Sequence, residues 1–396
     1  MTTPPTPNPE VQQEEEETFQ TGEVLTIAGG HFVHDTFSAF LSPLLPLIIE
    51  KLSLTLTSAG FLQAFLQFPT ILTPFIGYMA DRVSVRYFVI FAPAVTATVM
   101  SSLGLVSSYF NLVVMLLVTG ISVACFHAPA PAMIGRISGN QVGRGMAIFM
   151  ASGELGRTVG PLLITWAVTA LTLEGTYQIM VIGWVASFIL FWRLNRIPAR
   201  TNRPDDISAL WPVIRRLFLP LFVVVLFRSF LVVPPALYLP TLMNFRGSSL
   251  MVGAGALAVW EFAGVIGALT GGTISDYVGR KIVILVGILA SVILTLVFLN
   301  ASGWLLVPIL LGLGFTGLSS TPVMFAIVQE HLPNNRAVGS GIFIAMNFLA
   351  RPVAIAGIGL IGDNFGLDTA YFWGAIVSLL AIPAIYFLPE IKNETP

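Results

Sequence analysis

The sequence predicts an all-α membrane protein in which twelve transmembrane helices form two similar six-helix halves. Three observations lead to this prediction: the composition, the spacing of the apolar segments and an internal repeat. The chain has 396 residues, of which 55% are hydrophobic and 10% are charged, and its mean hydropathy is +0.86. Soluble domains carry about 25% charged residues, so the composition excludes a soluble protein. The net charge of −1 gives no basic surface for nucleic acid.

The apolar residues are grouped in segments of the length that a membrane requires. A spanning helix needs about 20 mostly apolar residues, and Pro or Gly within it is tolerated where neighbouring helices satisfy the freed backbone groups. Twelve segments meet this requirement: 24–49, 56–79, 87–107, 110–135, 144–171, 176–193, 213–243, 249–274, 281–300, 303–329, 337–362 and 369–389.

These segments divide the chain into two halves with polar parts around them. Residues 23–193 form the predicted N-terminal half and residues 213–390 the C-terminal half. Residues 194–212 between them are predicted to be a cytoplasmic linker. Residues 1–22 are rich in Pro, Thr and Glu and have too few apolar side chains to fold, so we predict a disordered acidic tail. Residues 391–396 form a short cytoplasmic tail.

The distribution of basic residues predicts the orientation. Fourteen of the 19 Lys and Arg residues lie on the side of the segments that both termini share, whereas Lys51 and Arg246 lie on the opposite side. By the positive-inside rule, both termini and the linker are cytoplasmic, in a multi-pass protein of the cell inner membrane. The other three basic residues, Arg157, Arg228 and Arg351, lie in the middle of apolar segments.

One loop motif occurs in each half. The sequence GYMADRVSVR follows the second segment, and GTISDYVGRK follows the eighth, 195 residues later. This spacing is close to half of the chain, and parallel halves with a substrate between them are a known transporter architecture. The acidic residue can cap a helix or pair with a basic residue and so latch one closed state; the alternative is a turn that anchors the chain by its positive charges. The predicted latch residues are Asp81, Arg82, Arg86, Asp276, Arg280 and Lys281.

The second copy of this loop closely resembles the G-x-x-x-D-x-x-G-R-K signature of the major facilitator superfamily, whereas Ser84 replaces the second glycine in the first copy. In the fifth segment, Gly156 to Pro161 resemble the G-x-x-x-G-P signature of antiporters in that superfamily. Small residues four apart let helices approach closely, and the proline bends the helix. The pattern favours export over import, and ordinary packing of small residues is its alternative.

Three further features resemble the fosmidomycin-resistance-like branch of the superfamily. They are the His/Asp stretch of the first segment running into Leu44-Leu45-Pro46, the stretch Phe126-His127-Ala128-Pro129, and Gly135-Arg136 with Gly143-Arg144-Gly145. The resemblance implies a proton-driven exporter of small anionic or drug-like compounds. Related drug antiporters use an Arg in the fourth segment for proton coupling. Residues 110–127 contain no Arg, and His127 is the residue that could take its role.

Ionisable residues inside apolar segments are functional candidates by default. His31, His34 and Asp35 share one helix face because they follow the i, i+3, i+4 spacing, and His127 lies at a similar depth on a helix that lines the cavity in the superfamily. Histidine titrates near neutral pH, with an unperturbed pKa of about 6.5. We therefore predict that these four residues and Glu154 handle protons, with Arg157 either tuning Glu154 or neutralising it. The alternative for each histidine is a structural hydrogen bond.

Two other interpretations of the His31–Asp35 stretch follow from its residue types. His31, His34 and Asp35 are types that bind metals, but one helix supplies only part of a coordination shell, so we predict no metal and no cofactor. The spacing H-x-x-x-D also occurs in some acyltransferases. This match is five residues long and lies on a helix that the transporter fold explains, so we predict that the protein is not an enzyme.

The charged residues of the C-terminal half predict a substrate site. Arginine keeps its charge when buried, and its guanidinium binds carboxylates or phosphonates through two hydrogen bonds. We expect Glu261 to pair with Arg228 or Arg351 and to leave the other for an anionic ligand; the alternative is that both belong to structural ion pairs. The predicted substrate-binding residues are Arg157, Arg228, Tyr238, Glu261, Asn347 and Arg351.

Together these features predict a proton-coupled secondary transporter that exports a small organic, anionic or amphiphilic compound by alternating access. The alternatives are a proton symporter that imports an organic anion and a sensor that binds its ligand without transport. The predicted partners are the substrate, protons and the lipid bilayer, with no nucleic acid, and the protein is predicted to be a monomer.

Overall fold

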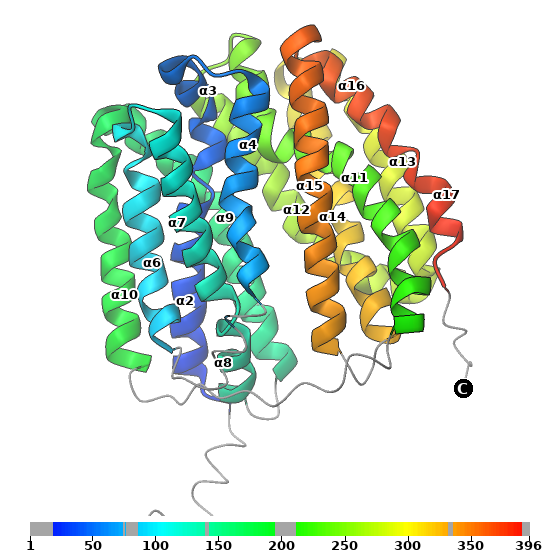
Figure 1. Ribbon diagram of the computed structural model, residues 1–396, viewed down its shortest axis with the longest axis horizontal. Helices are drawn as coiled ribbons and strands as arrows, with labels where there is room; N and C mark the ends of the chain where they lie inside the picture. Colours follow the sequence, from blue (N-terminus) through cyan, green and yellow to red (C-terminus); the bar gives the residue numbers. More distant parts are fainter. Residues whose placement is uncertain are drawn as a thin grey trace, which may run out of the picture.

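The computed structural model describes residues 19–73, 76, 86–138, 142–194, 211–331 and 336–389, and the regular secondary structure in these ranges is helical. The helices form two groups that stand side by side (Figure 1), one from each half of the sequence. The prediction of an all-α membrane fold is confirmed.

The helices of the N-terminal half are α2 (Thr21–Ser38), α3 (Leu41–Leu52), α4 (Leu56–Gln67), η1 (Phe68–Leu72), α6 (Arg86–Ser101), η2 (Leu103–Leu105), α7 (Tyr109–His127), α8 (Ala130–Ile137), α9 (Val142–Gly175), η4 (Thr176–Met180) and α10 (Val181–Leu194). Those of the C-terminal half are α11 (Trp211–Phe245), α12 (Leu250–Val278), α13 (Arg280–Asn300), η6 (Gly303–Leu305), α14 (Leu306–His331), α15 (Arg336–Phe365), α16 (Leu367–Ser378) and α17 (Ala381–Tyr386). Each of the twelve predicted segments coincides with a helix or a broken helix.

Ten stretches of described helix are long and apolar enough to cross a membrane. The stretch 148–194 contains two of the predicted segments, because the backbone of Thr172 leaves the helical conformation (φ 65°) and ends the first of them. The segment that begins at Leu56 is described as far as Leu72 as a shorter apolar helix. The ten stretches therefore contain eleven of the twelve predicted segments, and most of segment 56–79 beyond Thr73 lies outside the described residues.

Proline residues explain where two of the spanning segments break. Between α2 and α3 the helix is interrupted at Ala39 and Phe40, since Pro43 has no N–H to donate to the carbonyl of residue 39. Between α7 and α8 the interruption falls at Ala128 and Pro129. The first break lies one turn after Asp35 and the second directly after His127.

Three hydrophobic cores show how the halves are joined. We call the side on which α2 and α11 begin the terminal side, at the lower edge of Figure 1, and the side on which α4 begins the far side. One core combines residues of both halves, including Phe40 and Leu44 with Leu237 and Ile355. Of the other two, one is built from the C-terminal half and one from the N-terminal half. The halves therefore share a core only in part.

Hydrogen bonds between the halves lie toward the far side in the described part of the chain. The carboxylate of Asp363 accepts hydrogen bonds from the backbone N–H groups of Leu56 (2.5 Å) and Thr57 (3.0 Å) and from the Thr57 hydroxyl (2.6 Å). The Tyr238 hydroxyl donates to the carbonyl of Leu56 (2.8 Å), and Ser42 donates to the carbonyl of Leu237 (2.8 Å). A carboxylate at the start of a helix is stabilised by the free N–H groups and the helix dipole.

Candidate functional site

Glycines on α9 allow α2 to pack closely against it. A Cβ atom built on Gly156 would lie 2.4 Å from the carbonyl oxygen of Phe32, and one on Gly160 would lie 2.5 Å from that of Thr36. A Cβ on Gly153 would lie 2.4 Å from the imidazole of His31. Side chains larger than hydrogen would therefore push the two helices apart. The close packing predicted for the Gly156–Pro161 motif is confirmed, and it brings the polar face of α2 against α9.

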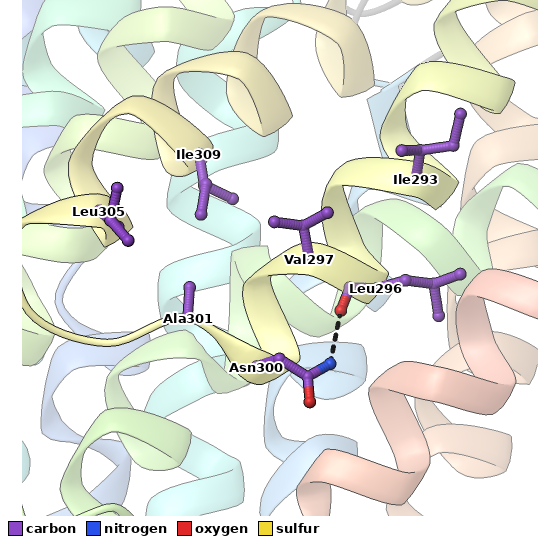
Figure 2. A pocket seen from close by; sticks show the side chains of 7 residues that line it. All are labelled: Ile293, Leu296, Val297, Asn300, Ala301, Leu305 and Ile309. Atoms are coloured by element: carbon purple, nitrogen blue, oxygen red, sulfur yellow. Dashed lines mark hydrogen bonds between the residues drawn. The ribbon is translucent and has the colours of Figure 1, made fainter.

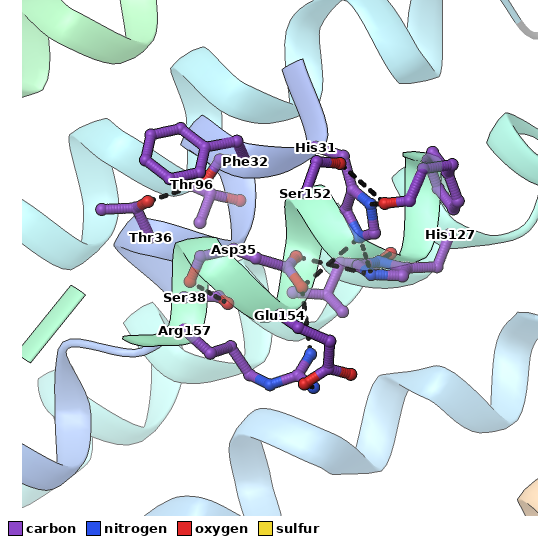
Figure 3. Close-up of polar contacts among 12 residues, drawn as sticks. His31, Phe32, Asp35, Thr36, Ser38, Thr96, His127, Ser152, Glu154 and Arg157 are labelled. Carbon is purple, nitrogen blue, oxygen red and sulfur yellow. Dashed lines mark hydrogen bonds and ion pairs between the residues drawn. The ribbon is translucent and has the colours of Figure 1, made fainter. Parts of the chain in front are cut away.

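Three ionisable side chains from α2 and α7 meet beside this contact (Figure 3). The Nε2 atoms of His31 and His127 lie 3.2 Å apart. Each also lies 3.4 Å from a carboxylate oxygen of Asp35, His31 from Oδ2 and His127 from Oδ1. We call His31, Asp35 and His127 the triad. His31 and Asp35 are buried, whereas the His127 side chain is 36% exposed, so the triad opens on the His127 side.

The outer nitrogens of both triad histidines are held by backbone carbonyls. His31 Nδ1 lies 2.8 Å from the carbonyl of Phe149, and His127 Nδ1 lies 3.0 Å from that of Val123. A nitrogen at these distances from a carbonyl oxygen carries the proton. In two neutral rings the Nε2 lone pairs would therefore face each other at 3.2 Å, which is repulsive. A cation between the two nitrogens removes this repulsion, the simplest being a proton that makes one ring an imidazolium.

Arg157 connects the triad to Glu154. One guanidinium nitrogen of Arg157 lies 3.3 Å from Asp35 Oδ2, and the other forms an ion pair with Glu154. The pairing of Arg157 with Glu154 was expected from their spacing, but the contact with Asp35 was not. The Arg157 side chain is 39% exposed, so it can also contact a molecule between the halves.

His34 shares a helix face with His31 and Asp35, and its ring lies 5.6 Å from that of His127, but it makes no ion pair or hydrogen bond with the triad in the described part of the chain. Its ring is fully buried and stacks on Phe126, with 4.7 Å between the ring centroids. Among the described residues, neither ring nitrogen has a partner in full hydrogen-bond geometry. Phe126 and Phe149 also stack on His31, so aromatic side chains fix both histidines of α2.

Glu261 and Arg351 extend the charged network into the C-terminal half. Glu261 of α12 interacts electrostatically with Arg157, Glu154 and Arg351. Sequence reasoning sought the partner of Glu261 only among the arginines of its own half. The structure adds Arg157 from the other half, and α9 packs directly against α12. Arg157 therefore lies between the triad and the charges of the C-terminal half.

Three other predicted substrate residues have their polar groups occupied within the protein. Arg228 is 5% exposed and donates to the Ser320 hydroxyl (2.7 Å), to the Gly317 carbonyl (2.6 Å) and to the Thr321 hydroxyl (2.7 Å). The Asn347 amide donates to Phe343 O of its own helix (2.9 Å), and the Tyr238 hydroxyl is used between the halves. Arg351 is half-buried, and it is better placed than these three to contact a ligand.

The second copy of the loop motif forms the local ion pair that its spacing suggested. Asp276 pairs with Arg280 at 2.6 Å, and Lys281 donates to the carbonyl of Tyr386 at 3.2 Å. Gly279 has φ of +97°, a conformation that favours glycine. In the first copy, the Arg86 guanidinium lies over the ring of Tyr87, while Asp81 and Arg82 lie outside the described residues. The role of these residues as a latch stays a prediction.

A groove on the outer surface is chemically different from this site. Figure 2 shows it between α13 and the start of α14, lined by apolar side chains such as Ile293, Val297 and Leu305. Its amide side chain, Asn300, donates to the carbonyl of Leu296 at 3.0 Å. No ionisable residue lines the groove, so it suits a hydrocarbon chain rather than a polar substrate.

The fold and the site define a polytopic membrane transporter with a charged network between two helical halves. A sequence model of the Major Facilitator Superfamily matches residues 27–355 and, separately, residues 256–396. The chain belongs to the Major Facilitator Superfamily. It is a multi-pass secondary transporter, and the expectation that it is not an enzyme agrees with this family.

Three known proteins illustrate the relationship. The chain is 24% identical over 378 residues to the fosmidomycin resistance protein of Escherichia coli (strain K12). The aligned region covers 93% of each protein. The fold of the chain is similar to that of a D-xylose-proton symporter (TM-score 0.77, 16% identity, 96% of this chain and 100% of the other). It is also similar to a bacterial Spinster homologue in an inward-facing, unoccupied conformation (TM-score 0.72, 14% identity, 93% and 95%).

Proposed function

We propose that this transporter is proton-coupled and exports a small organic compound, anionic or amphiphilic, by alternating access. The observation that carries the proposal is the position of the two Nε2 atoms, 3.2 Å apart with both Nδ1 atoms held by carbonyls. This geometry favours a cation between the rings, and a proton can supply it. Histidine is the side chain that exchanges protons near neutral pH, and Asp35 balances the charge of the imidazolium.

Arg157 couples the proton to the substrate in this proposal. With the triad deprotonated, the charge of Asp35 is not compensated by an imidazolium and strengthens the contact of Arg157 with α2. With the triad protonated, the imidazolium compensates Asp35, and Arg157 keeps its ion pair with Glu154 and is attracted more strongly to Glu261. Because Glu261 belongs to the other half, protonation changes the attraction between the halves near the centre of the molecule. The proton therefore biases the equilibrium between the two alternating states.

The substrate binds between His127 of the triad and Arg351. Its anionic group pairs with Arg351, while a hydrogen-bond donor on the substrate takes the place of the proton at the exposed edge of the triad. Proton and substrate then exclude each other, as exchange across a membrane requires. Arg228 keeps its positive charge among neutral acceptors and supports Arg351 by attracting anions to this side.

A second candidate is a proton symporter that imports an organic anion. The charges of the site favour this function for a ligand that does not reach the triad. An anion that contacts only Arg157 and Arg351 would bind more tightly when the triad is protonated, because protonation adds positive charge nearby. Proton and anion would then move together. The two candidates differ in whether the ligand reaches the triad, so the direction of transport separates them.

Orientation and direction rest on several indications. The excess of Lys and Arg on the terminal side supports cytoplasmic termini. With that orientation, the shared core and the hydrogen bonds of Asp363 close the outer side, which is the state that receives a compound from the cytoplasm. The G-x-x-x-G-P pattern of α9 and the similarity to a fosmidomycin resistance protein both support export, and we propose that the monomer is the working unit.

Transport by everted membrane vesicles tests the proposal. Fosmidomycin and a panel of small organic anions are offered outside vesicles whose interior is acidified by respiration, with vesicles lacking the protein as control. Export predicts accumulation inside the vesicles, which ends when nigericin dissipates the pH gradient. Accumulation in right-side-out vesicles driven by external acid would favour the symporter. Transport that ignores the pH gradient in both preparations would contradict proton coupling.

A further inference from the structure

We propose that the triad of His31, Asp35 and His127 is also a binding site for a divalent transition metal of the zinc and cobalt class. The ligand atoms of the three residues all lie within 4.8 Å of one another. The distances are 3.2 Å between the two Nε2 atoms and 3.4 Å from each Nε2 to a carboxylate oxygen. This inference does not depend on transport, because it concerns equilibrium binding to the resting protein.

The spacing of the ligand atoms fits a metal ion at their centre. Zinc binds imidazole nitrogen at about 2.0–2.1 Å and carboxylate oxygen at about 2.0–2.2 Å, in tetrahedral geometry. Ligand atoms at those distances from a tetrahedral centre are about 3.4 Å from one another. The separations of 3.2, 3.4 and 3.4 Å lie within about 0.2 Å of this value. The two Nε2 atoms approach different oxygens of Asp35, so the carboxylate would bind the ion through both oxygens or turn so that one of them serves. Little movement of His31, Asp35 or His127 is therefore needed to coordinate an ion.

The surroundings of the two histidines match those of metal ligands. A ligating histidine generally donates its other ring nitrogen to a carbonyl or carboxylate, which fixes the tautomer and the ring orientation. His31 and His127 both do so, to the carbonyls of Phe149 and Val123. Stacking on Phe149, with 4.0 Å between centroids, also holds the His31 ring. The Nε2 lone pairs are therefore already oriented toward a common point.

The donor set and the charge of the site select the class of metal. Two imidazoles and one carboxylate suit zinc, cobalt or nickel, whereas magnesium and calcium prefer oxygen ligands alone. His127 is 36% exposed, so a fourth position can be filled by water or by a group of a ligand. Arg157 must yield its contact with Asp35 to the metal, and its ion pair with Glu154 compensates its charge when it does.

Sequence reasoning predicted no metal because it considered the ligands of one helix. His31, His34 and Asp35 on α2 supply an incomplete shell, and in the structure His34 turns into an aromatic environment instead. His127 from α7 replaces it and completes a three-residue site from two helices. The proposal therefore rests on a residue whose position relative to Asp35 is visible only in the fold.

Cobalt binding to the purified full-length protein tests this site. The protein is purified with a tag free of histidine, treated with EDTA, dialysed and titrated with Co²⁺, and the visible absorption of tetrahedral Co²⁺ is recorded together with binding by calorimetry. We expect one equivalent of Co²⁺ to bind, and Zn²⁺ to displace it. His127→Ala and Asp35→Asn should weaken binding at least about tenfold, whereas His331→Ala, outside the triad, should bind as the wild type does.

Each other outcome contradicts the proposal. Absence of a cobalt spectrum, or equal affinity in His127→Ala and the wild type, would overturn it. Loss of cobalt binding in His34→Ala but not in His127→Ala would show that His34, and not His127, binds the metal together with the other α2 residues. Because His127 is partly exposed, His127→Ala is the variant least disruptive to folding, and its thermal unfolding midpoint without metal serves as the check. A failed titration leaves the transport proposal untouched, since a proton alone can occupy the triad.

Discussion

Arg157 of α9 contacts Asp35 of α2 at 3.3 Å while the same guanidinium pairs with Glu154. One side chain thus links the candidate proton site to the centre of the molecule, where Glu261 and Arg351 lie within electrostatic range. The contact exists because glycines of α9 let α2 approach. Its two carboxylate partners explain how an arginine is accommodated in an otherwise apolar spanning helix.

Arg157→Lys should uncouple proton and substrate movement. A lysine keeps the charge but is a single ammonium group, and it cannot hold two carboxylates with the geometry of a guanidinium. The loss of a hydrogen bond to a charged group has a smaller effect at a partly exposed site, and the Arg157 side chain is 39% exposed. We therefore expect the rate of proton-driven transport to fall about tenfold. Arg193→Lys at the end of α10 is the matched control. Wild-type rates in Arg157→Lys vesicles would disprove the coupling role.

Gly156→Ala should destabilise the contact between α2 and α9. The added methyl group would lie 2.4 Å from the carbonyl oxygen of Phe32, and overpacking of this kind costs about 1–3 kcal/mol. The thermal unfolding midpoint in detergent should therefore fall. Gly255→Ala on α12 is the control, because nothing lies within 4 Å of its added Cβ and alanine favours the helix. A midpoint unchanged in Gly156→Ala would show that the helices do not pack this closely.

Asp363→Asn should weaken the closure of the far side. The neutral amide loses the charge that stabilises the start of α4 and one of the acceptor oxygens for Leu56 and Thr57. In a Cys125→Ser background, spin labels at Asn111 and Asn364 on the two halves should report a larger population at long distance. Asp368→Asn, at an exposed ion pair with Arg246, should leave the distance distribution unchanged. The same distribution in both variants would argue against Asp363 as a closure contact.

Arg351→Gln and Arg228→Gln should separate substrate binding from stability. Arg351 is half-buried and near Glu261, so its loss should reduce ligand-induced stabilisation and leave the unfolding midpoint of the free protein close to that of the wild type. Arg228 makes three buried hydrogen bonds. Its loss should lower the unfolding midpoint, because buried acceptors left unpaired reduce the free energy of unfolding by about 1–3 kcal/mol. A thermal-shift screen with fosmidomycin and organic anions measures both effects. The reversed pattern would make Arg228 the ligand residue.

The fold was predictable because a membrane constrains the sequence strongly. Apolar segments of spanning length and the repeated loop ending in Gly279, Arg280 and Lys281 defined the helices and their grouping. The breaks in two segments follow from Pro43 and Pro129. Helix ends such as Thr172, where a threonine leaves the helix at φ 65°, carry no comparable signal.

The site was predictable only in part. Periodicity grouped His31, His34 and Asp35 on one face, and the depth of His127 in the fourth segment placed it with them. Neither could show that the ring of His34 stacks on Phe126 instead of pairing with Asp35. The contacts of Arg157 with Asp35 and of Asp363 with α4 join helices that are far apart in the sequence. The only hint for Asp363 was a carboxylate near the end of an apolar segment. Tyr238 and Asn347 were chosen by residue type, which does not reveal that the Tyr238 hydroxyl donates to Leu56 of the other half and the Asn347 amide to Phe343 of its own helix.

Asp35→Asn tests the central claim, that the triad is the proton site, most directly. The amide cannot balance an imidazolium between His31 and His127, so the proton should no longer be held there. Everted vesicles containing Asp35→Asn should show no accumulation of substrate driven by the pH gradient, while exchange of labelled for unlabelled substrate and the unfolding midpoint persist. Asp368→Asn vesicles are the control and should accumulate substrate normally. Accumulation at the wild-type rate in Asp35→Asn vesicles would contradict the account.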